Sequence, residues 1–184
     1  MAAQSTMVKL GALAPDFTLP DTVSGREISL DSIKSGRATV IMFLCNHCPY
    51  VKHVNAGLVA LANDYQPRGA AFVAISSNDV EAYPQDGPEE MRAVARALGY
   101  PFPYLYDESQ DVARAYGAAC TPDFFIYDGD MRLVYRGQLD DSRPKNNLPV
   151  TGQDIRAVLD SLLAGEPVST EQKPSIGCSI KWKA

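Results

Sequence analysis

The chain has 184 residues, of which 46% are hydrophobic and 21% charged, a composition typical of a globular domain that excludes a disordered or collagen-like protein. Its 17 basic and 22 acidic residues give a net charge of -5, which argues against nucleic acid as the main partner. Four cysteines form too few disulfides to stabilise a secreted fold of this length. We find no apolar run of the length needed for a signal-peptide core or a membrane span, and therefore expect a cytoplasmic domain without a membrane partner.

The first 36 residues are punctuated by glycines and prolines, and Phe17 and Leu19 alternate with polar neighbours. This pattern predicts a short β-hairpin that forms an N-terminal extension, 1–36, rather than a separate domain. The next segment, 39–44 (TVIMFL), is an unbroken apolar run, which is typical of a strand buried on both faces. It leads directly into the sequence CNHCPY.

Apolar residues then recur at helical spacing from Val51 to Tyr65 and stop before Pro67 and Gly69. The spacing predicts a helix that begins at or just after Cys45. Cys45 therefore lies where a buried strand gives way to a helix.

The rest of the chain alternates between strands and helices. Strands are predicted over 71–75, 124–127 and 133–136, and helices over 88–98, 109–116 and 151–163. The last two strands are typical of an antiparallel hairpin, and Thr151 with Asp154 resembles a capping box. Residues 166–184 are expected to form an irregular tail. The order of elements predicts an α/β fold in one domain over 1–184, with helices flanking a mixed central sheet.

The two cysteines of CNHC are the strongest functional signal. Because two residues separate Cys45 from Cys48, the pair can close a small disulfide ring, and one thiol can attack a substrate disulfide while the other resolves it. We expect Cys45 to be the nucleophile, since backbone N–H groups at the helix start stabilise a thiolate there, and Cys48, one turn further in, to resolve. The pKa of Cys45 is then predicted to lie below the free-cysteine value of about 8.5.

Asn46 and His47 lie between the cysteines and are expected to tune the potential. A partly protonated His47 imidazole beside Cys45 favours the reduced form and makes the disulfide a stronger oxidant. The alternative is a zinc site, because Cys45, Cys48 and His53 offer two or three ligands. Closed structural zinc sites use four ligands, and no second Cys or His pair at short spacing exists, so we predict neither metal nor cofactor.

The strand, CNHC and helix, followed later by a Thr-Pro step before a strand, resemble the thioredoxin superfamily. The segments APDFTLPD and ISL resemble its redoxin branch, which includes cytochrome-maturation thiol-disulfide oxidoreductases and peroxiredoxins of the alkyl hydroperoxide reductase and thiol-specific antioxidant group. More narrowly, the chain resembles a bacterial family of thioredoxin-like proteins. The segments that carry this resemblance are CNHCPYVKH, SSNDVEAYPQDGPEEM, PFPYLYDE, TPDFF, VYRGQLDDSRP and SIGCSIKWK. The resemblance spans nearly the whole chain and implies a thioredoxin-like fold.

The resemblance implies that Pro122 is a cis-proline facing the dithiol, which leaves the backbone of Thr121 free to pair with an incoming peptide. The alternative is a proline that merely begins a strand. Thioredoxins keep a buried acid on the strand before the motif, and 39–44 contains none. Asp123 is therefore the candidate to relay the Cys48 proton, with a solvated or turn-capping Asp as the alternative.

In the peroxiredoxins of the redoxin branch, the peroxidatic cysteine follows the pattern Pro-x-x-x-Thr/Ser-x-x-Cys. Before Cys45, the Pro and Thr/Ser places hold Ala38 and Met42, and before Cys48 they hold Ile41 and Cys45. Neither cysteine fits, so a peroxidase is the alternative rather than the main expectation.

Two further cysteines are possible additional redox groups. Cys120 lies two residues before Pro122 and is expected near the dithiol, with packing as the alternative. Cys178 lies in the tail, which would offer a resolving thiol if it folded back over the dithiol, although packing is the more common role. Asn78 and Asp79 follow the strand 71–75 at its carboxyl end, where α/β sheets gather their sites, and are candidates for lining a substrate groove.

The sequence thus predicts a thiol-disulfide oxidoreductase with roles in antioxidant defence and redox homeostasis. Its expected partners are protein disulfides or dithiols as substrates and an unidentified thiol reductant or oxidant. We expect a monomer or weak dimer that binds no nucleic acid. The alternatives are a thiol peroxidase, a non-catalytic redox sensor and a metal-binding module.

Overall fold

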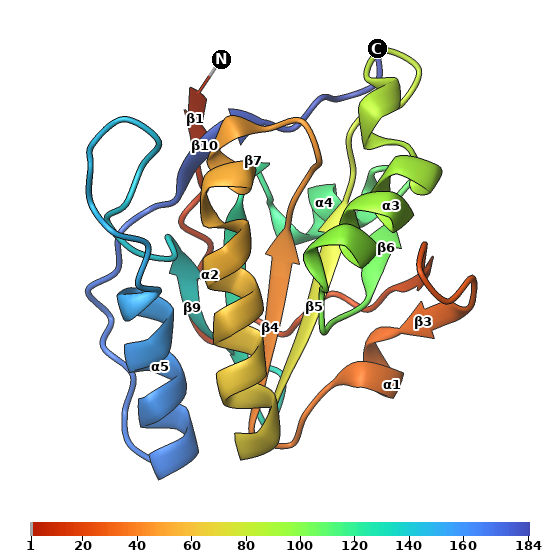
Figure 1. The fold of residues 1–184 in the computed structure, drawn as a ribbon. Coiled ribbons are helices and arrows are strands. Elements are labelled where there is room, and N and C mark those ends of the chain that lie inside the picture. Colours follow the sequence, from red (N-terminus) through yellow and green to blue (C-terminus); the bar gives the residue numbers. More distant parts are fainter. Residues whose placement is uncertain (1) are drawn as a thin grey trace.

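The computed structural model describes residues 2–184 and has a five-stranded central sheet in the order β6-β5-β4-β8-β9 (Figure 1). These strands are β4 (Ala38–Phe43), β5 (Ala70–Ser76), β6 (Tyr104–Tyr106), β8 (Asp123–Asp128) and β9 (Leu133–Gly137). β5 runs parallel to both β4 and β6, whereas β8 lies antiparallel to β4 and β9. The sheet is therefore mixed, and the β8–β9 hairpin forms one edge, as the sequence predicts.

Helices cover both faces of this sheet. The buried residues of α2 (Pro49–Tyr65), α3 (Pro88–Leu98) and α5 (Gln153–Ala164) share one core cluster, and α2 and α5 lie side by side in front of the sheet (Figure 1). α1 (Leu30–Ile33) and α4 (Asp111–Tyr116) contribute to the cluster on the opposite face. Short 3-10 helices span Gln66–Arg68 and Pro84–Asp86. Within residues 2–184, the helices are too short or too polar for any of them to cross a bilayer.

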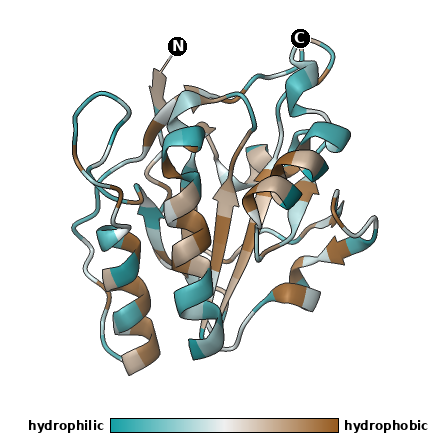
Figure 2. Ribbon diagram, viewed as in Figure 1, coloured by the Kyte–Doolittle hydropathy of each residue, from teal (hydrophilic) through white to brown (hydrophobic). Residues whose placement is uncertain are grey.

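β4 contributes side chains to the hydrophobic clusters on both faces of the sheet. Every residue of it is buried, and its side chains alternate, since Val40 and Met42 join the α2 side while Ile41 and Phe43 join the other. Burial of each large apolar side chain contributes about 1.5–3 kcal/mol, which fixes the register of this strand and so the position of Cys45 beyond its end. Figure 2 shows hydrophobic colour along β4 and β5, whereas the visible faces of α2 and α5 mix hydrophilic and hydrophobic residues.

The N-terminal extension pairs within itself and with the tail. β2 (Thr18–Pro20) and β3 (Glu27–Ser29) form the antiparallel hairpin. β1 (Ala2–Gln4), β10 (Ile176–Ser179) and β7 (Cys120–Thr121) form a second sheet in the order β1-β10-β7. The tail is therefore irregular except over β10, which lies between two segments far away in the sequence.

The expected capping box before α5 is wrong. The N-cap of α5 is Gly152, whose φ of 69° is left-handed and which has no side chain to cap the helix. Asp140 Oδ2 accepts hydrogen bonds from the backbone N–H groups of Thr151 at 2.7 Å and Gly152 at 2.6 Å. Thr151 Oγ1 accepts from Gln153 N at 3.3 Å, whereas the Asp154 side chain accepts from Gln138 Nε2 at 2.7 Å and not from the helix start.

Candidate active site

The two cysteines of CNHC lie between the end of β4 and the start of α2. Cys48 is the N-cap of α2, and Pro49 is its first residue. The expectation that Cys48 lies one turn inside the helix is therefore wrong, because proline favours the first helical position and the helix begins after both cysteines. Cys45 is 2% exposed and Cys48 fully buried.

A cis peptide between Thr121 and Pro122 brings β7 against both sulfurs. Cys45 Sγ lies 3.2 Å from the Thr121 hydroxyl oxygen, and Cys48 Sγ lies 3.2 Å from the Thr121 carbonyl oxygen. One residue therefore supplies a hydroxyl to the first cysteine and a carbonyl acceptor to the second.

Asp86 holds the residues between the cysteines, and the sequence analysis did not single it out. Its fully buried carboxylate accepts from Asn46 N at 2.8 Å, His47 N at 3.1 Å and Asn78 Nδ2 at 2.8 Å, and His47 Nδ1 lies 2.5 Å from Oδ2. The His47 ring also stacks on Tyr83, with centroids 5.3 Å apart. The His47 ring is thus held between a carboxylate and an aromatic ring.

Cys45 and Cys48 interact so closely that each sulfur shifts the pKa of the other. The contact with Cys48, burial and the Asp86 carboxylate disfavour a thiolate on Cys45 and so raise its pKa. The contacts with Thr121 favour a thiolate there, because the Cys48 thiol donates to the Thr121 carbonyl and the Thr121 hydroxyl lies beside Cys45 Sγ. The lowered pKa expected at Cys45 therefore stays a prediction.

Asp123 and Cys120 form a buried pair on the other side of the cis-proline. The Asp123 carboxyl accepts from Ala119 N at 3.3 Å, its Oδ1 has no hydrogen-bond partner among the described residues, and burial raises its pKa to about 8. Burial and the nearby Asp123 raise the pKa of Cys120. Within residues 2–184 no hydrogen bond joins Asp123 to Cys48, so a proton relay between them remains a prediction.

The backbone of Thr121 is already paired, in contrast to the expectation that it stays free. Thr121 lies opposite Cys178 in the antiparallel pairing of β7 with β10. Gly177 approaches so closely that an added Cβ would lie 2.0 Å from the Thr121 carbonyl oxygen. The tail therefore folds back over the dithiol, and Cys178 packs against the core cluster that contains Cys45 and Cys48.

Cys45, His47 and Asp86 are metal-ligating residue types whose donor atoms lie within 4.8 Å of one another. The 2.5 Å separation of His47 Nδ1 and Asp86 Oδ2 is that of a hydrogen bond. Two ligands that each lie about 2.0–2.2 Å from a tetrahedral zinc ion must be more than about 3 Å apart, so this arrangement does not fit an ion as it stands. His53, the other ligand considered, instead lies with Nε2 at 2.7 Å from Ser142 Oγ.

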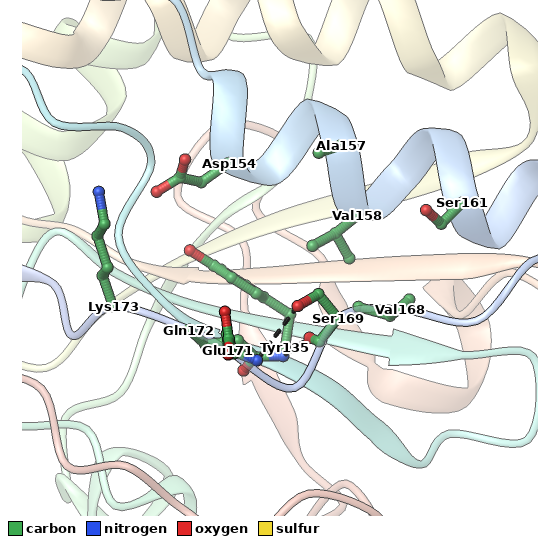
Figure 3. Close-up of a pocket in the computed structure, with 10 residues that line it drawn as sticks. All are labelled: Tyr135, Asp154, Ala157, Val158, Ser161, Val168, Ser169, Glu171, Gln172 and Lys173. Carbon is green, nitrogen blue, oxygen red and sulfur yellow. Dashed lines mark hydrogen bonds between the residues drawn. The ribbon is translucent and has the colours of Figure 1, made fainter.

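The pocket in Figure 3 lies apart from these residues. It is lined by α5, by Tyr135 of β9 and by tail residues 168–173. Its lining has no cysteine or histidine, so it offers none of the groups that thiol chemistry needs. Asp86, by contrast, follows β5 in the loop where Asn78 was expected to line a groove, and the position of this loop at the carboxyl end of β5 was the available signal.

A mixed sheet with helices on both faces, a buried Cys-x-x-Cys at the start of α2 and an adjacent cis-proline define a protein of the thioredoxin superfamily. Residues 10–136 match the AhpC/TSA family, and the chain belongs to this family. The fold is shared by the thioredoxin domain of a Bacteroides vulgatus thiol-disulfide oxidoreductase, at 16% identity and a TM-score of 0.65 over 83% of this chain and 99% of that one.

The relatives of this chain are named for two different activities. The chain is 26% identical to the thiol-disulfide oxidoreductase ResA of Geobacillus thermodenitrificans over 86% of this chain and 81% of ResA. It is 31% identical to a Mycobacterium tuberculosis protein provisionally named a peroxiredoxin, over 62% of this chain and 68% of that protein. The crystal structure of an uncharacterised conserved protein from Geobacillus kaustophilus has 64% identity and a TM-score of 0.98, covering 100% of this chain and 97% of that one.

Proposed function

We propose that this protein is a thiol-disulfide oxidoreductase that uses Cys45 and Cys48 as its redox pair. The observation that carries the proposal is the contact of both sulfurs with Thr121, each at 3.2 Å, beside a cis-proline. The relationship to ResA supports the same activity. The substrates are protein disulfides or dithiols. An external thiol of unidentified nature returns the Cys45–Cys48 pair to its starting redox state.

Thr121 distinguishes the two cysteines. The Cys48 thiol donates to the Thr121 carbonyl, and the Thr121 hydroxyl donates to a thiolate on Cys45. Cys45, the more exposed sulfur and the one next to the half-buried Asn46 and His47, then attacks.

The reaction follows two exchanges. The Cys45 thiolate attacks one sulfur of a substrate disulfide, a mixed disulfide forms, and the other substrate sulfur leaves as a thiolate. Cys48 then attacks Cys45 Sγ, which releases the second substrate thiolate and leaves a Cys45–Cys48 disulfide. The substrate gains two electrons, the dithiol loses two, and a second thiol pair reduces the protein again.

Reduction of insulin by dithiothreitol tests this activity. Turnover should fall to the uncatalysed rate in Cys45→Ser and in Cys48→Ser, and stay unchanged in Asp130→Asn, a control in an exposed turn. Cys48→Ser should accumulate a mixed disulfide on Cys45. Wild-type turnover no faster than dithiothreitol alone contradicts the activity, and a mixed disulfide that accumulates in Cys45→Ser instead reverses the two roles.

A thiol peroxidase is the second candidate, because the family includes such enzymes by name and a hydroxyl lies beside Cys45. That hydroxyl belongs to Thr121 rather than to position 42, where peroxidatic motifs carry it and this chain has methionine. Peroxide consumption that survives in Cys48→Ser would favour the peroxidase. The cytoplasmic location and the monomeric or weakly dimeric state stay predictions, to be measured by cell fractionation and by sedimentation.

A further inference from the structure

The C-terminal strand β10 brings a third thiol to the dithiol. Its Cys178 lies opposite Thr121, the residue that contacts both Cys45 and Cys48. The Cys178 thiol is half-buried and packs against the core cluster that contains both Cys45 and Cys48. Three sulfurs therefore gather around one residue, and they come from two segments more than a hundred residues apart in the sequence.

Anchors on both sides of Cys178 hold the strand in this position. Before it, Ser175 Oγ donates to the Pro122 carbonyl at 2.6 Å, and Ser5 N donates to the Ser175 carbonyl at 3.0 Å. After it, Lys181 N donates to Asn78 Oδ1 at 2.9 Å. The close approach of Gly177 to Thr121 adds a contact that no other residue type allows. Hydrogen bonds on both sides of Cys178 thus fix its position in the fold.

We propose that Cys178 is a third redox cysteine that exchanges with the oxidised pair. This inference rests on the proposed function, which supplies the Cys45–Cys48 disulfide. The Cys178 thiolate attacks Cys48 Sγ, a Cys48–Cys178 bond forms, the Cys45–Cys48 bond breaks, and Cys45 leaves as a thiolate that takes up the proton lost by Cys178. No net oxidation occurs, because one disulfide replaces another.

The exchange returns Cys45 to its reactive form while the protein stays oxidised. The oxidised protein then holds its disulfide between α2 and the tail, and the pairing of β10 with β7 becomes covalently locked. Because Cys178 lies in the strand that occupies the Thr121 backbone, this state also blocks that backbone to an incoming peptide. Cys178 thus links the redox state of the dithiol to the position of the tail.

Disulfide mapping of the oxidised wild-type protein tests the exchange. Trypsin cleaves after Arg37 and Lys52, so Cys45 and Cys48 share one peptide, and Cys178 lies on another. The protein is oxidised with one equivalent of diamide, alkylated without denaturant and digested with trypsin once its free thiols are blocked. We expect a cross-linked pair of these peptides with an alkylated Cys45. In Cys178→Ser the cross-link should vanish and Cys45 should resist alkylation, while the exposed-turn variant Asp130→Asn should behave as the wild type.

The outcomes separate this inference from the proposed function. If insulin is reduced and Cys45 closes onto Cys48 while Cys178 remains fully alkylated, the exchange is refuted and the oxidoreductase stands. If no disulfide forms at Cys45 or Cys48 and insulin is not reduced, both fail. A Cys45→Ser variant gives a second measurement, because diamide should then join Cys48 to Cys178, and free thiols at both positions in the folded variant would overturn the inference.

Discussion

Asp123 lies directly after the cis-proline and is fully buried, and one of its carboxyl oxygens has no hydrogen-bond partner within residues 2–184, so its charge state should dominate the pH dependence of stability. Burial raises its pKa from the ordinary 3.8 to about 8. The folded state therefore binds the proton more tightly than the unfolded state. The contribution to stability is fully present below pH 4, decreases as the pH rises, and levels off above about pH 8.

The magnitude follows from the two pKa values of Asp123. Each tenfold change in proton affinity corresponds to about 1.4 kcal/mol, and roughly three such steps separate the ordinary pKa of Asp from pH 7. Folding at pH 7 must therefore protonate Asp123 at a cost of about 4 kcal/mol. Asp123→Asn keeps the shape and stays neutral, so the free energy of unfolding at pH 7 should rise by about this amount, with almost no change at pH 4.

Urea unfolding under reducing conditions at pH 4, 6, 7 and 8 measures this difference between wild type and Asp123→Asn. The exposed Asp130, on the turn that follows β8, supplies the matched control Asp130→Asn, whose stability should follow the wild type at every pH. A difference between wild type and Asp123→Asn that does not change with pH would refute the reasoning, since the carboxyl would then have its ordinary acidity in the folded protein.

Three further substitutions test the dithiol and the strand β10 that lies over it. Asp86→Asn removes the carboxylate that raises the pKa of Cys45, so the Cys45 alkylation rate at pH 7 should increase; an unchanged rate would exclude this electrostatic effect. Gly177→Ala forces β10 away from Thr121, so we expect a loss of about 1–3 kcal/mol in urea unfolding and several-fold faster alkylation of the dithiol. The control is Gly36→Ala, which has open space around it. Thr121→Val removes the hydroxyl that stabilises the Cys45 thiolate, so insulin reduction should slow by about tenfold, the equivalent of about 1.4 kcal/mol, and an unaltered rate would contradict this role.

The core of the fold was predictable because its elements carry local patterns. The run 39–44 became β4 over Ala38–Phe43, and the helical spacing from Val51 to Tyr65 became α2 over Pro49–Tyr65. These segments bury apolar side chains on both faces or on one, so their periodicity appears directly in the sequence. The small sheet β1-β10-β7 has no such pattern, because Ile176–Ser179 contains glycine, serine and cysteine, and its pairing depends on partners far away in the chain.

The residues that lie together in the candidate site were predictable, and the contacts that hold them were not. CNHC and Thr121-Pro122 were identifiable by motif, whereas the place of Cys48 relative to the helix depended on where α2 begins. Pro49 carried that signal, since proline favours the first helical position and so makes Cys48 the N-cap. The place of the Asp86 loop at the carboxyl end of β5 was readable from the sequence, but its hydrogen bonds to Asn46 and His47, forty residues away, were not.

Thr121 joins the acidity of the dithiol to the position of the tail. Its hydroxyl contacts Cys45, its carbonyl contacts Cys48, and its backbone pairs with the strand that carries Cys178. A peptide can pair with the Thr121 backbone only where β10 does not occupy it. Displacement of the tail therefore exposes the one residue that contacts both sulfurs.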